Sequence, residues 1–142
     1  MTTPTLNGQL IGQAQLATRA VLDQLLAETG TPFVQWVVLN VLATSGGTLP
    51  RSELVDRVAS GVKVDESDAR GALGELVAAR FVEDDDSTAR LTGPGAARYG
   101  QIQAGIDAIT ARLYGDLPPA DLAAAARVLT IVTKRANASL AR

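Results

Sequence analysis

Six basic side chains lie between residues 51 and 92, and their types suit the binding of anionic groups. An arginine guanidinium presents its N–H donors in a planar fork, which matches a carboxylate, a phosphate or the edge of a guanine base. The same segment holds ten acidic residues, so its net charge is −4. Contact with a polyanion therefore depends on where each arginine is placed. The basic residues are Arg51, Arg57, Lys63, Arg70, Arg80 and Arg90.

Most catalytic chemistry is excluded by residue type. The chain has no histidine and no cysteine, which removes general acid-base histidines, disulfides, thiol redox sensing and the two commonest soft metal ligands. No nucleophile elbow and no phosphate-cradling glycine loop is present. The acidic pairs are better explained as helix caps and surface charge. The sequence therefore predicts a protein that is not an enzyme and that uses no metal or other cofactor.

Length and composition indicate one folded domain made mostly of helices. The chain has 142 residues, of which 46% are hydrophobic and only 4% are aromatic. Such a chain can bury a core, and its wealth of Ala, Leu and Val favours helices packed on helices. Residues 1–9 carry no basic and apolar leader pattern, and no apolar run approaches the ~18 residues that a membrane span needs. We expect a soluble, cytoplasmic protein with no membrane partner.

The central segment predicts two helices joined by a turn. A short helix follows Pro50 and turns Leu54, Val55 and Val58 inward. After a long turn, Asp65 caps a second helix. The buried stripe expected for this second helix comprises Ala69, Ala72, Leu73 and Leu76.

A small β-hairpin completes this unit. Residues 81–82 and 89–91 alternate briefly on either side of a polar tip at 84–88, as the strands of a small antiparallel wing do. Two helices followed by such a hairpin form a winged helix-turn-helix, which lays its second helix into the major groove of DNA. The sequence thus predicts a mainly α (α+β) fold with a winged helix-turn-helix lobe and a two- or three-stranded wing.

Long helices flank the lobe on both sides. Apolar residues recur at steps of three and four between residues 7 and 28, Thr31 is positioned to cap the helix that follows, and Thr92 is positioned to cap a helix that ends near Gly115. The pair Pro118–Pro119 is typical of a further helix start. The apolar stripes of these helices exceed what one lobe can cover, which predicts a homodimer.

The expected organisation is one winged-helix domain, residues 1–142. Within it, residues 6–30 and 93–141 are predicted to form the dimerisation helices, and residues 32–92 the winged lobe.

The order of these elements and several local phrases resemble the MarR family of winged-helix regulators, from about Leu6 to Leu140. The resemblance implies a dimer whose terminal helices interlock, while two lobes straddle a pseudo-palindromic site in double-stranded DNA. It also implies release from DNA by a small aromatic or phenolic effector. The phrases are GTPFVQWVVL at 30–39, LPRSEL at 49–54, LVAARFV at 76–82 and LTGPG at 91–95.

The resemblance implies which residues face DNA. Arg51 and Ser52 would lie near the DNA backbone, and the wing would reach a minor groove. Arg70 is the best candidate for a guanine edge, since a bidentate contact is worth roughly 1–3 kcal/mol of discrimination. The implied base-reading positions are Ser67, Asp68, Arg70 and Gly71.

The charge of the lobe limits the affinity that we expect. Tight DNA binders commonly make about 6–10 contacts between basic residues and phosphates, and this lobe has six basic residues in total. We assign phosphate neutralisation to Arg51, Arg57 and Arg90. Nearby acids would subtract from their effect within a Debye length of about 8 Å, so we expect weaker and more salt-sensitive binding than a basic member of the family would show.

Four residues are candidates for an effector pocket. Phe33, Trp36 and Tyr99 could line it, with Arg98 holding a carboxylate or phenolate. Alternatively, these aromatic side chains belong to the core, which is the more frequent role of aromatics at helical spacing.

The sequence therefore favours a transcriptional regulator that is a homodimer, binds double-stranded DNA and is retuned by a small molecule. The alternative is a degenerate winged-helix module that binds a protein partner and has weak or no DNA binding.

Overall fold

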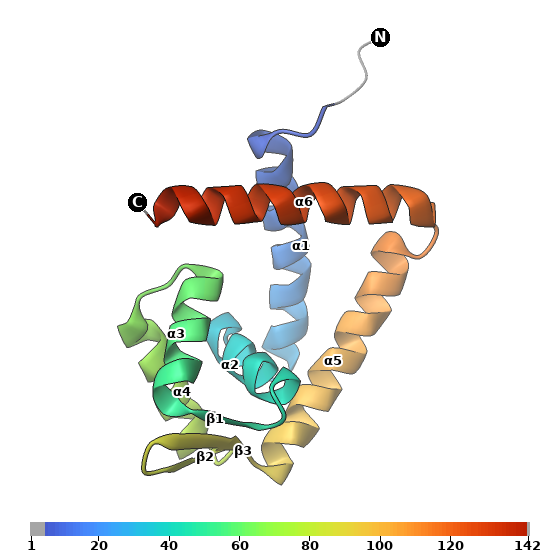
Figure 1. Ribbon diagram of the computed structural model, residues 1–142. Helices are drawn as coiled ribbons and strands as arrows, with labels where there is room; N and C mark the ends of the chain where they lie inside the picture. The colour runs from blue at the N-terminus through green and yellow to red at the C-terminus, as the bar shows by residue number, and fades with distance from the viewer. Residues whose placement is uncertain (1–4, 142) are drawn as a thin grey trace. The chain divides into compact units, whose positions relative to one another are not determined.

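Helices dominate the computed structural model, which describes residues 5–141, and a small sheet accompanies them (Figure 1). The predicted mainly α fold with a three-stranded wing region is confirmed. In chain order the elements are α1 (Gly8–Glu28), α2 (Phe33–Thr44), β1 (Thr48–Pro50), α3 (Arg51–Val62), α4 (Glu66–Ala78), β2 (Val82–Asp85), β3 (Thr88–Leu91), α5 (Gly93–Tyr114) and α6 (Pro119–Leu140).

Local capping explains where several helices begin. Asn7 Oδ1 accepts a hydrogen bond from the Leu10 N–H at 2.8 Å at the start of α1. The hydroxyl of Thr92 accepts from the Gly95 N–H at 3.0 Å at the start of α5, as the sequence predicts. These bonds satisfy amides that have no partner inside the helix.

The capping role expected for Thr31 is wrong. The N-cap residue of α2 is Pro32, and no side chain caps this helix. The Thr31 side chain is buried, and its hydroxyl lies 2.9 Å from that of Thr29 and accepts a bond from Arg98. The Thr31 hydroxyl therefore binds Arg98, which lies 67 positions further along the chain, and does not cap α2.

The turn between α3 and α4 is shorter than the sequence indicates. Helix α3 continues to Val62, so only residues 63–65 connect it to α4. Lys63 ends α3 with φ 57°, in the left-handed region, and the Val64 N–H then donates to the Ala59 carbonyl at 3.1 Å. This is an αL helix ending, which redirects the chain within a few residues.

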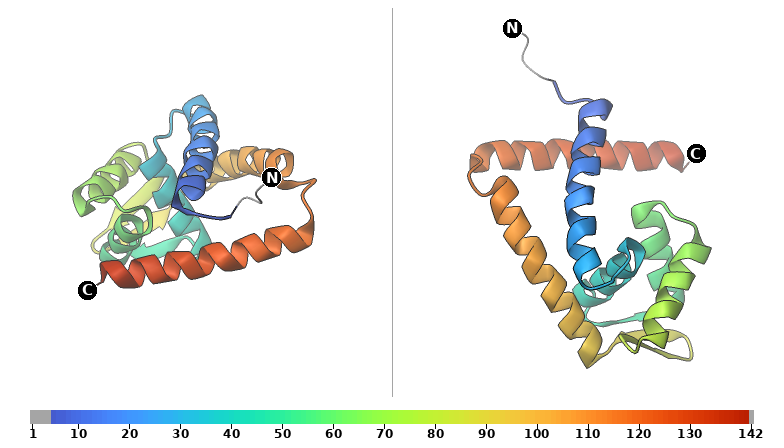
Figure 2. Two further views of the ribbon diagram at one scale, coloured as in Figure 1. Left: turned by 90° about the horizontal axis from the view of Figure 1, so that it is seen from above. Right: turned by 180° about the vertical axis from the view of Figure 1, so that it is seen from behind.

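The sheet lies at one edge of the α2–α4 lobe (Figures 1 and 2). Its antiparallel strands have the order β1-β3-β2. The central strand places the buried Ala89 opposite Leu49 on one side and Asp84 on the other. The residues Asp86 and Ser87 connect β2 to β3, and we call the β2–β3 hairpin the wing.

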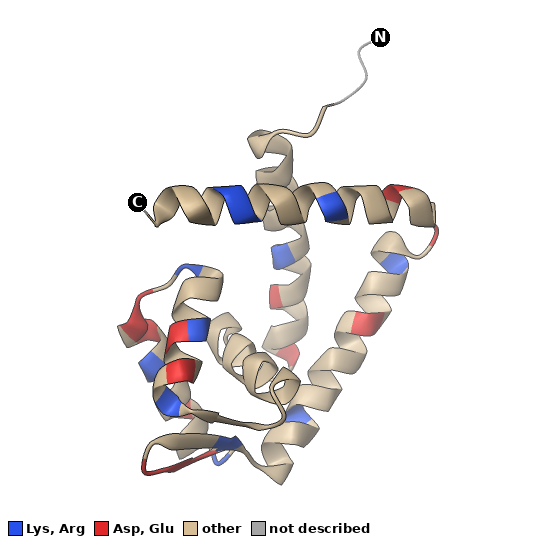
Figure 3. Cartoon of the chain, in the orientation of Figure 1, with Lys and Arg blue, Asp and Glu red and all other residues tan. Residues whose placement is uncertain are grey.

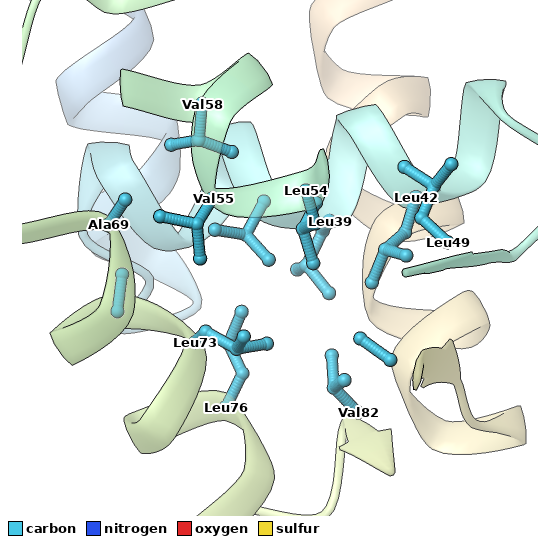
Figure 4. Packing of buried hydrophobic residues seen from close by; sticks show 13 residues of the cluster. Leu39, Leu42, Leu49, Leu54, Val55, Val58, Ala69, Leu73, Leu76 and Val82 are labelled. Atoms are coloured by element: carbon cyan, nitrogen blue, oxygen red, sulfur yellow. The ribbon is translucent and has the colours of Figure 1, made fainter. Parts of the chain in front are cut away.

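One apolar core holds the lobe together (Figure 4). Leu39 and Leu42 of α2, Leu54 of α3 and Leu76 of α4 are all buried and belong to a single cluster that also includes Val82 of the wing. The stripe predicted for the second helix, Ala69, Ala72, Leu73 and Leu76, is buried as expected. The core therefore fixes which face of α4 is turned to solvent.

A second cluster joins α1, α2 and α5. Leu26, Trp36 and Ile102 are buried there, with Phe33 and Tyr99 partly buried against them. This cluster contains three of the four predicted effector-pocket residues.

The chain divides into two compact units, one up to Ile106 and one from Asp107. The first contains α1 to β3 and most of α5, and the second contains the end of α5 and all of α6. In the described part of the second unit, α6 has no buried residue.

Among the described residues, no single helix is both long and apolar enough for a membrane crossing. The pair α1 and α2 passes that test only when taken together, and it is bent by 87°.

Candidate nucleic-acid interface

The exposed face of α4 is made of small residues. Because residues 69, 72, 73 and 76 of this helix are buried, the helical repeat turns Ser67, Gly71 and Gly74 to the opposite side. All three are exposed, and no atom lies within 4 Å of a Cβ built on either glycine. Another molecule can therefore approach the α4 backbone closely along this face.

Arg70 lies at the edge of this face. Its Nη2 donates to Glu66 Oε2 at 2.8 Å, one helical turn earlier, and both side chains are more than half exposed. Exposed pairs at this spacing are worth about 0.3–0.5 kcal/mol, so the pair opens at little cost. The guanidinium is available for another acceptor.

Three of the predicted DNA-facing residues share one hollow. They line a groove of about 240 Å³ and are Arg51 and Ser52 of α3 and Arg70 of α4. The rest of the lining consists of Val55 and Asp56 of α3 and Ser87 of the wing tip. The structure thus brings together residues from the start of α3, from α4 and from the wing. Arg51 and Arg70 are the cations of this groove, and Asp56 is its carboxylate.

The other predicted α4 residues lie elsewhere. Ser67, Asp68 and Gly71 line a separate hollow of about 350 Å³, whose other wall includes Pro32, Val34 and Gln35 at the start of α2. There Gln35 Nε2 donates to Glu75 Oε2 at 2.6 Å and ties the two helices together. Asp68 is exposed in the first turn of α4, where a carboxylate stabilises the positive end of the helix dipole.

Arg57 is held within its own part of the lobe. Its guanidinium donates to Glu53 Oε1 at 2.9 Å and to the Ser45 hydroxyl at 3.2 Å, in the turn before β1. It does not line the groove that contains Arg51, Ser52 and Arg70.

Arg90 lies on the outer face of the wing. It stands opposite Glu83 in the β2–β3 register and forms an ion pair with it. The hydrogen bond from Arg90 to Glu83, followed by the charges of Glu83 and Asp85, raises the pKa of Arg90. Since neighbouring strand residues point to opposite faces, Arg90 and the buried Ala89 face opposite ways.

Arg51 makes contacts that sequence reasoning missed. Its Nε donates to Asp84 Oδ1 at 2.9 Å, and its Nη2 donates to the same oxygen and to the Asp86 carbonyl. These partners stand 33 and 35 residues further along the chain. No local pattern could have signalled the contact, because it depends on the hairpin folding back onto α3.

The four arginines proposed for DNA contact therefore share one property. Each donates to a carboxylate of the same lobe: Arg51 to Asp84, Arg57 to Glu53, Arg70 to Glu66 and Arg90 to Glu83. Figure 3 shows basic and acidic positions close together on α3 and α4, and acidic ones at the outer end of the wing. A phosphate that approaches any of these guanidinium groups therefore also approaches the carboxylate that is already bound to it.

The aromatic candidates form part of a packed cluster. The rings of Trp36 and Tyr99 are stacked, with centroids 5.2 Å apart and planes 10° apart. The Tyr99 hydroxyl donates to Asn40 Oδ1 at 3.1 Å. Phe33 is covered by Arg19, whose guanidinium carbon lies 3.5 Å from the ring centroid.

Arg98 is engaged at the corner between α1 and α2. Its Nη1 donates to the Thr29 carbonyl at 2.7 Å and to the Thr31 hydroxyl at 3.2 Å. Its guanidinium carbon also lies 4.7 Å from the centroid of the Phe81 ring, at the root of the wing. Arg98 thus links the α1–α2 corner to the segment that leads into the wing.

Metal binding finds no support in the described residues. No group of three or more acidic side chains between residues 5 and 141 is arranged to hold a metal ion.

Comparison with known proteins identifies the fold. No family model matches the sequence, and no curated protein matches it either. Solved structures do match. A MarR family transcriptional regulator from Silicibacter pomeroyi is 22% identical with a TM-score of 0.77, over 92% of this chain and 88% of that one.

Two further structures are similar. BpsR of Bordetella bronchiseptica, whose DNA binding is regulated by 6-hydroxynicotinic acid, has a TM-score of 0.71 at 22% identity, over 92% of this chain and 99% of that one. NadR in complex with 4-hydroxyphenylacetate has a TM-score of 0.75 at 21% identity, over 90% and 95% of the two chains. At this level of identity the comparisons establish the fold.

Proposed function

We propose that this chain, whose fold is that of the MarR family regulators as its sequence indicated, is a dimeric regulator of transcription that binds double-stranded DNA sequence-specifically. The observation that carries the proposal is the groove shared by the start of α3, by α4 and by the wing tip, beside an α4 face of small exposed residues. In a winged helix-turn-helix the second helix, here α4, enters the major groove.

The proposed contacts divide by chemistry. Arg70 and Ser67 read base edges, with Asp68 and Gly71 beside them on the same helix. Ser52 lies at the groove and faces the DNA backbone. Arg57 and Arg90 neutralise phosphates after leaving their carboxylate partners. The ion pairs involving these arginines are exposed and therefore cost little to open, while the negative lobe keeps the affinity low at physiological salt.

Dimerisation is proposed through residues 6–30 and 93–141. Every large apolar side chain that is exposed in residues 5–141 lies in these two ranges and none lies in the winged lobe. Removing such side chains from water beneath a second copy lowers the free energy of the pair. They are Leu6, Leu10, Leu16, Leu113, Tyr114, Leu117, Val128, Leu129, Ile131, Val132 and Leu140.

The proposed effector is a small aromatic or phenolic compound. BpsR and NadR are each linked to a hydroxylated aromatic acid. In this chain Phe33, Trp36 and Tyr99 belong to one cluster, and Arg98 precedes Tyr99 in α5 and donates to Thr29 at the α1–α2 corner. Binding there would alter the distance between the two recognition helices, which we place near one DNA turn, about 34 Å.

A salt series tests the DNA proposal. Binding of the protein to a duplex from its own upstream region is measured by fluorescence anisotropy, for the wild type and for Arg70→Ala and Arg90→Ala. We expect Arg70→Ala to cost about 1–3 kcal/mol on the specific duplex and little on a scrambled one. Arg90→Ala should flatten the slope of log affinity against log salt by about one unit on both duplexes. Equal affinity of the wild type for both duplexes at low salt would contradict sequence-specific recognition.

A second function is favoured by one observation. All four candidate arginines already form ion pairs with carboxylates of the lobe. This favours the alternative that the lobe binds DNA weakly or not at all and binds a basic protein partner instead. In that case Arg70→Ala leaves any DNA retention unchanged, and reversing the charges of Asp84, Asp85 and Asp86 abolishes partner binding.

A further inference from the structure

The side chain of Arg51 connects two elements that are distant in sequence. Arg51 is the first residue of α3, and its guanidinium donates to the carboxylate of Asp84 and to the backbone carbonyl of Asp86. Its own backbone N–H donates to the Ser87 carbonyl at 2.6 Å. The start of α3 is thereby joined to the end of β2 and to both residues of the turn.

The other three ion pairs of the candidate arginines are more local. Arg57 and Arg70 pair within a single helix at a spacing of four residues, and Arg90 pairs with the opposite strand of the same hairpin. The pair of Arg51 and Asp84 is also less exposed, with exposed side-chain fractions of 41% and 28%. It is therefore the pair that orients one element against another.

The outer end of the wing needs such support. A two-stranded hairpin is at best marginally stable in water. Strand β1 supports β3, and its register with β3 ends at the pair of Pro50 and Thr88, before the turn. In the turn, Asp86 has φ 53°, in the left-handed region that aspartate adopts more readily than most residues. Its carbonyl is one of the groups that Arg51 holds.

We propose that Arg51 is a positioning residue, which holds the wing tip against the first turn of α3, rather than a direct phosphate contact. Arg51 forms an ion pair with Asp84, and two of the three guanidinium nitrogens of Arg51 donate to the wing. The wing tip thereby keeps a defined place at the edge of the groove. The inference rests on the proposed function only where DNA binding is measured.

The distinction between the two roles depends on fork geometry. A lysine ammonium also binds a phosphate, as a point charge, so Arg51→Lys would keep a direct phosphate contact. A clamp that uses Nε and Nη2 on two different acceptors needs the planar fork, which an ammonium group lacks. Arg51→Lys therefore separates the roles while leaving the net charge unchanged.

The first test measures wing order in the free protein. Amide hydrogen exchange of residues 84–88 is compared between the wild type, Arg51→Lys, Asp84→Asn and the matched control Arg57→Lys. We expect exchange to be about tenfold faster in Arg51→Lys and Asp84→Asn, as the loss of one charge-assisted hydrogen bond implies. Exchange in Arg57→Lys should equal that of the wild type. Unchanged exchange in Arg51→Lys overturns the proposal.

The second test measures DNA binding across a salt series. We expect Arg51→Met to weaken binding while leaving the slope of log affinity against log salt unchanged, because no phosphate contact is lost. A slope that falls by about one unit means a direct phosphate contact and overturns the proposal whatever the exchange result. Should the wild type bind no DNA, the proposed function fails, and the exchange experiment alone still decides whether Arg51 holds the wing.

Discussion

Individual arginines in this protein have different roles, although all of them carry the same guanidinium group. Arg70 lies along its own helix and can leave Glu66 at little cost. Arg51 joins α3 to the wing, and Arg98 joins α5 to the α1–α2 corner. The difference comes from the number and placement of acceptors around each guanidinium. Counting basic residues therefore overestimates how many are available to DNA.

The Tyr99 hydroxyl should stabilise the second cluster. Tyr99→Phe keeps the ring stack with Trp36 but removes the hydrogen bond to Asn40, so we expect the free energy of unfolding to fall by about 0.5–1.5 kcal/mol. Urea unfolding measures this. Tyr114→Phe serves as the control, because the Tyr114 hydroxyl makes no hydrogen bond within residues 5–141, and its variant should match the wild type. A Tyr99→Phe variant as stable as the wild type would show that the hydroxyl contributes nothing.

Helix α4 contains glycines that lower its stability but leave its backbone accessible to another molecule. Its glycines lie on the exposed face, where no neighbour would touch an added Cβ. A glycine in a helix costs about 0.5–1 kcal/mol relative to alanine. The fold gains nothing visible from these glycines, which is consistent with a face that a second molecule approaches closely.

Gly71→Ala should separate folding from recognition. We expect this variant to be more stable by about 0.5–1 kcal/mol and to bind its duplex more weakly, because the added methyl group stands between the α4 backbone and DNA. Thermal unfolding and fluorescence anisotropy measure the two effects. Gly100→Ala, at an exposed glycine of α5 with open space around it, should show the gain in stability alone. Undiminished DNA affinity of Gly71→Ala would argue against close approach at this position.

The start of α5 depends on a glycine for the opposite reason. A Cβ on Gly95 would lie 2.0 Å from the Phe81 carbonyl oxygen and 2.9 Å from Leu91 Cδ1. We expect Gly95→Ala to lose about 1–3 kcal/mol of unfolding free energy, the usual cost of overfilling a packed site. Gly100→Ala on the same helix is again the control in thermal unfolding. Wild-type stability of Gly95→Ala would mean that α5 can shift away from Phe81 freely.

This chain is proposed to act as one half of a homodimer. Helix α6 exposes Val128, Leu129, Ile131 and Val132 at 40–43% each, and among its described residues none is buried. Apolar surface of this kind is stabilised when a second copy covers it. DNA recognition by two lobes would then depend on the pairing of the terminal helices.

Ile131→Lys should therefore separate the two copies. Placing an ammonium group in an apolar interface is strongly unfavourable, whereas at an exposed position of a single chain it costs little. We expect sedimentation analysis to show monomers, with helical content retained by circular dichroism and DNA affinity reduced. Ala79→Lys, at an exposed position after α4, adds the same charge and should leave the oligomeric state unchanged. A dimer of undiminished stability in Ile131→Lys would place the interface elsewhere.

Elements with strong local signals were predictable from the sequence. Asn7, Thr92 and Pro119 mark helix starts through their own capping or backbone chemistry. The stripe of α4 was predictable because a helical repeat of apolar residues has only one face to bury. For these features the cause lies within a few residues of the effect.

Where partners are distant in sequence, only the tertiary structure decided the outcome. Thr31 turned from a helix cap into an acceptor for Arg98, and Arg51 turned toward the wing tip. Each change joins residues more than 30 positions apart, which become neighbours only after the core has formed. The sequence by itself determined where helices form and which faces of α3 and α4 are buried, because those properties follow from local periodicity. The partner of each charged side chain was decided by folding, since a guanidinium binds whichever acceptor the packed elements place within its reach.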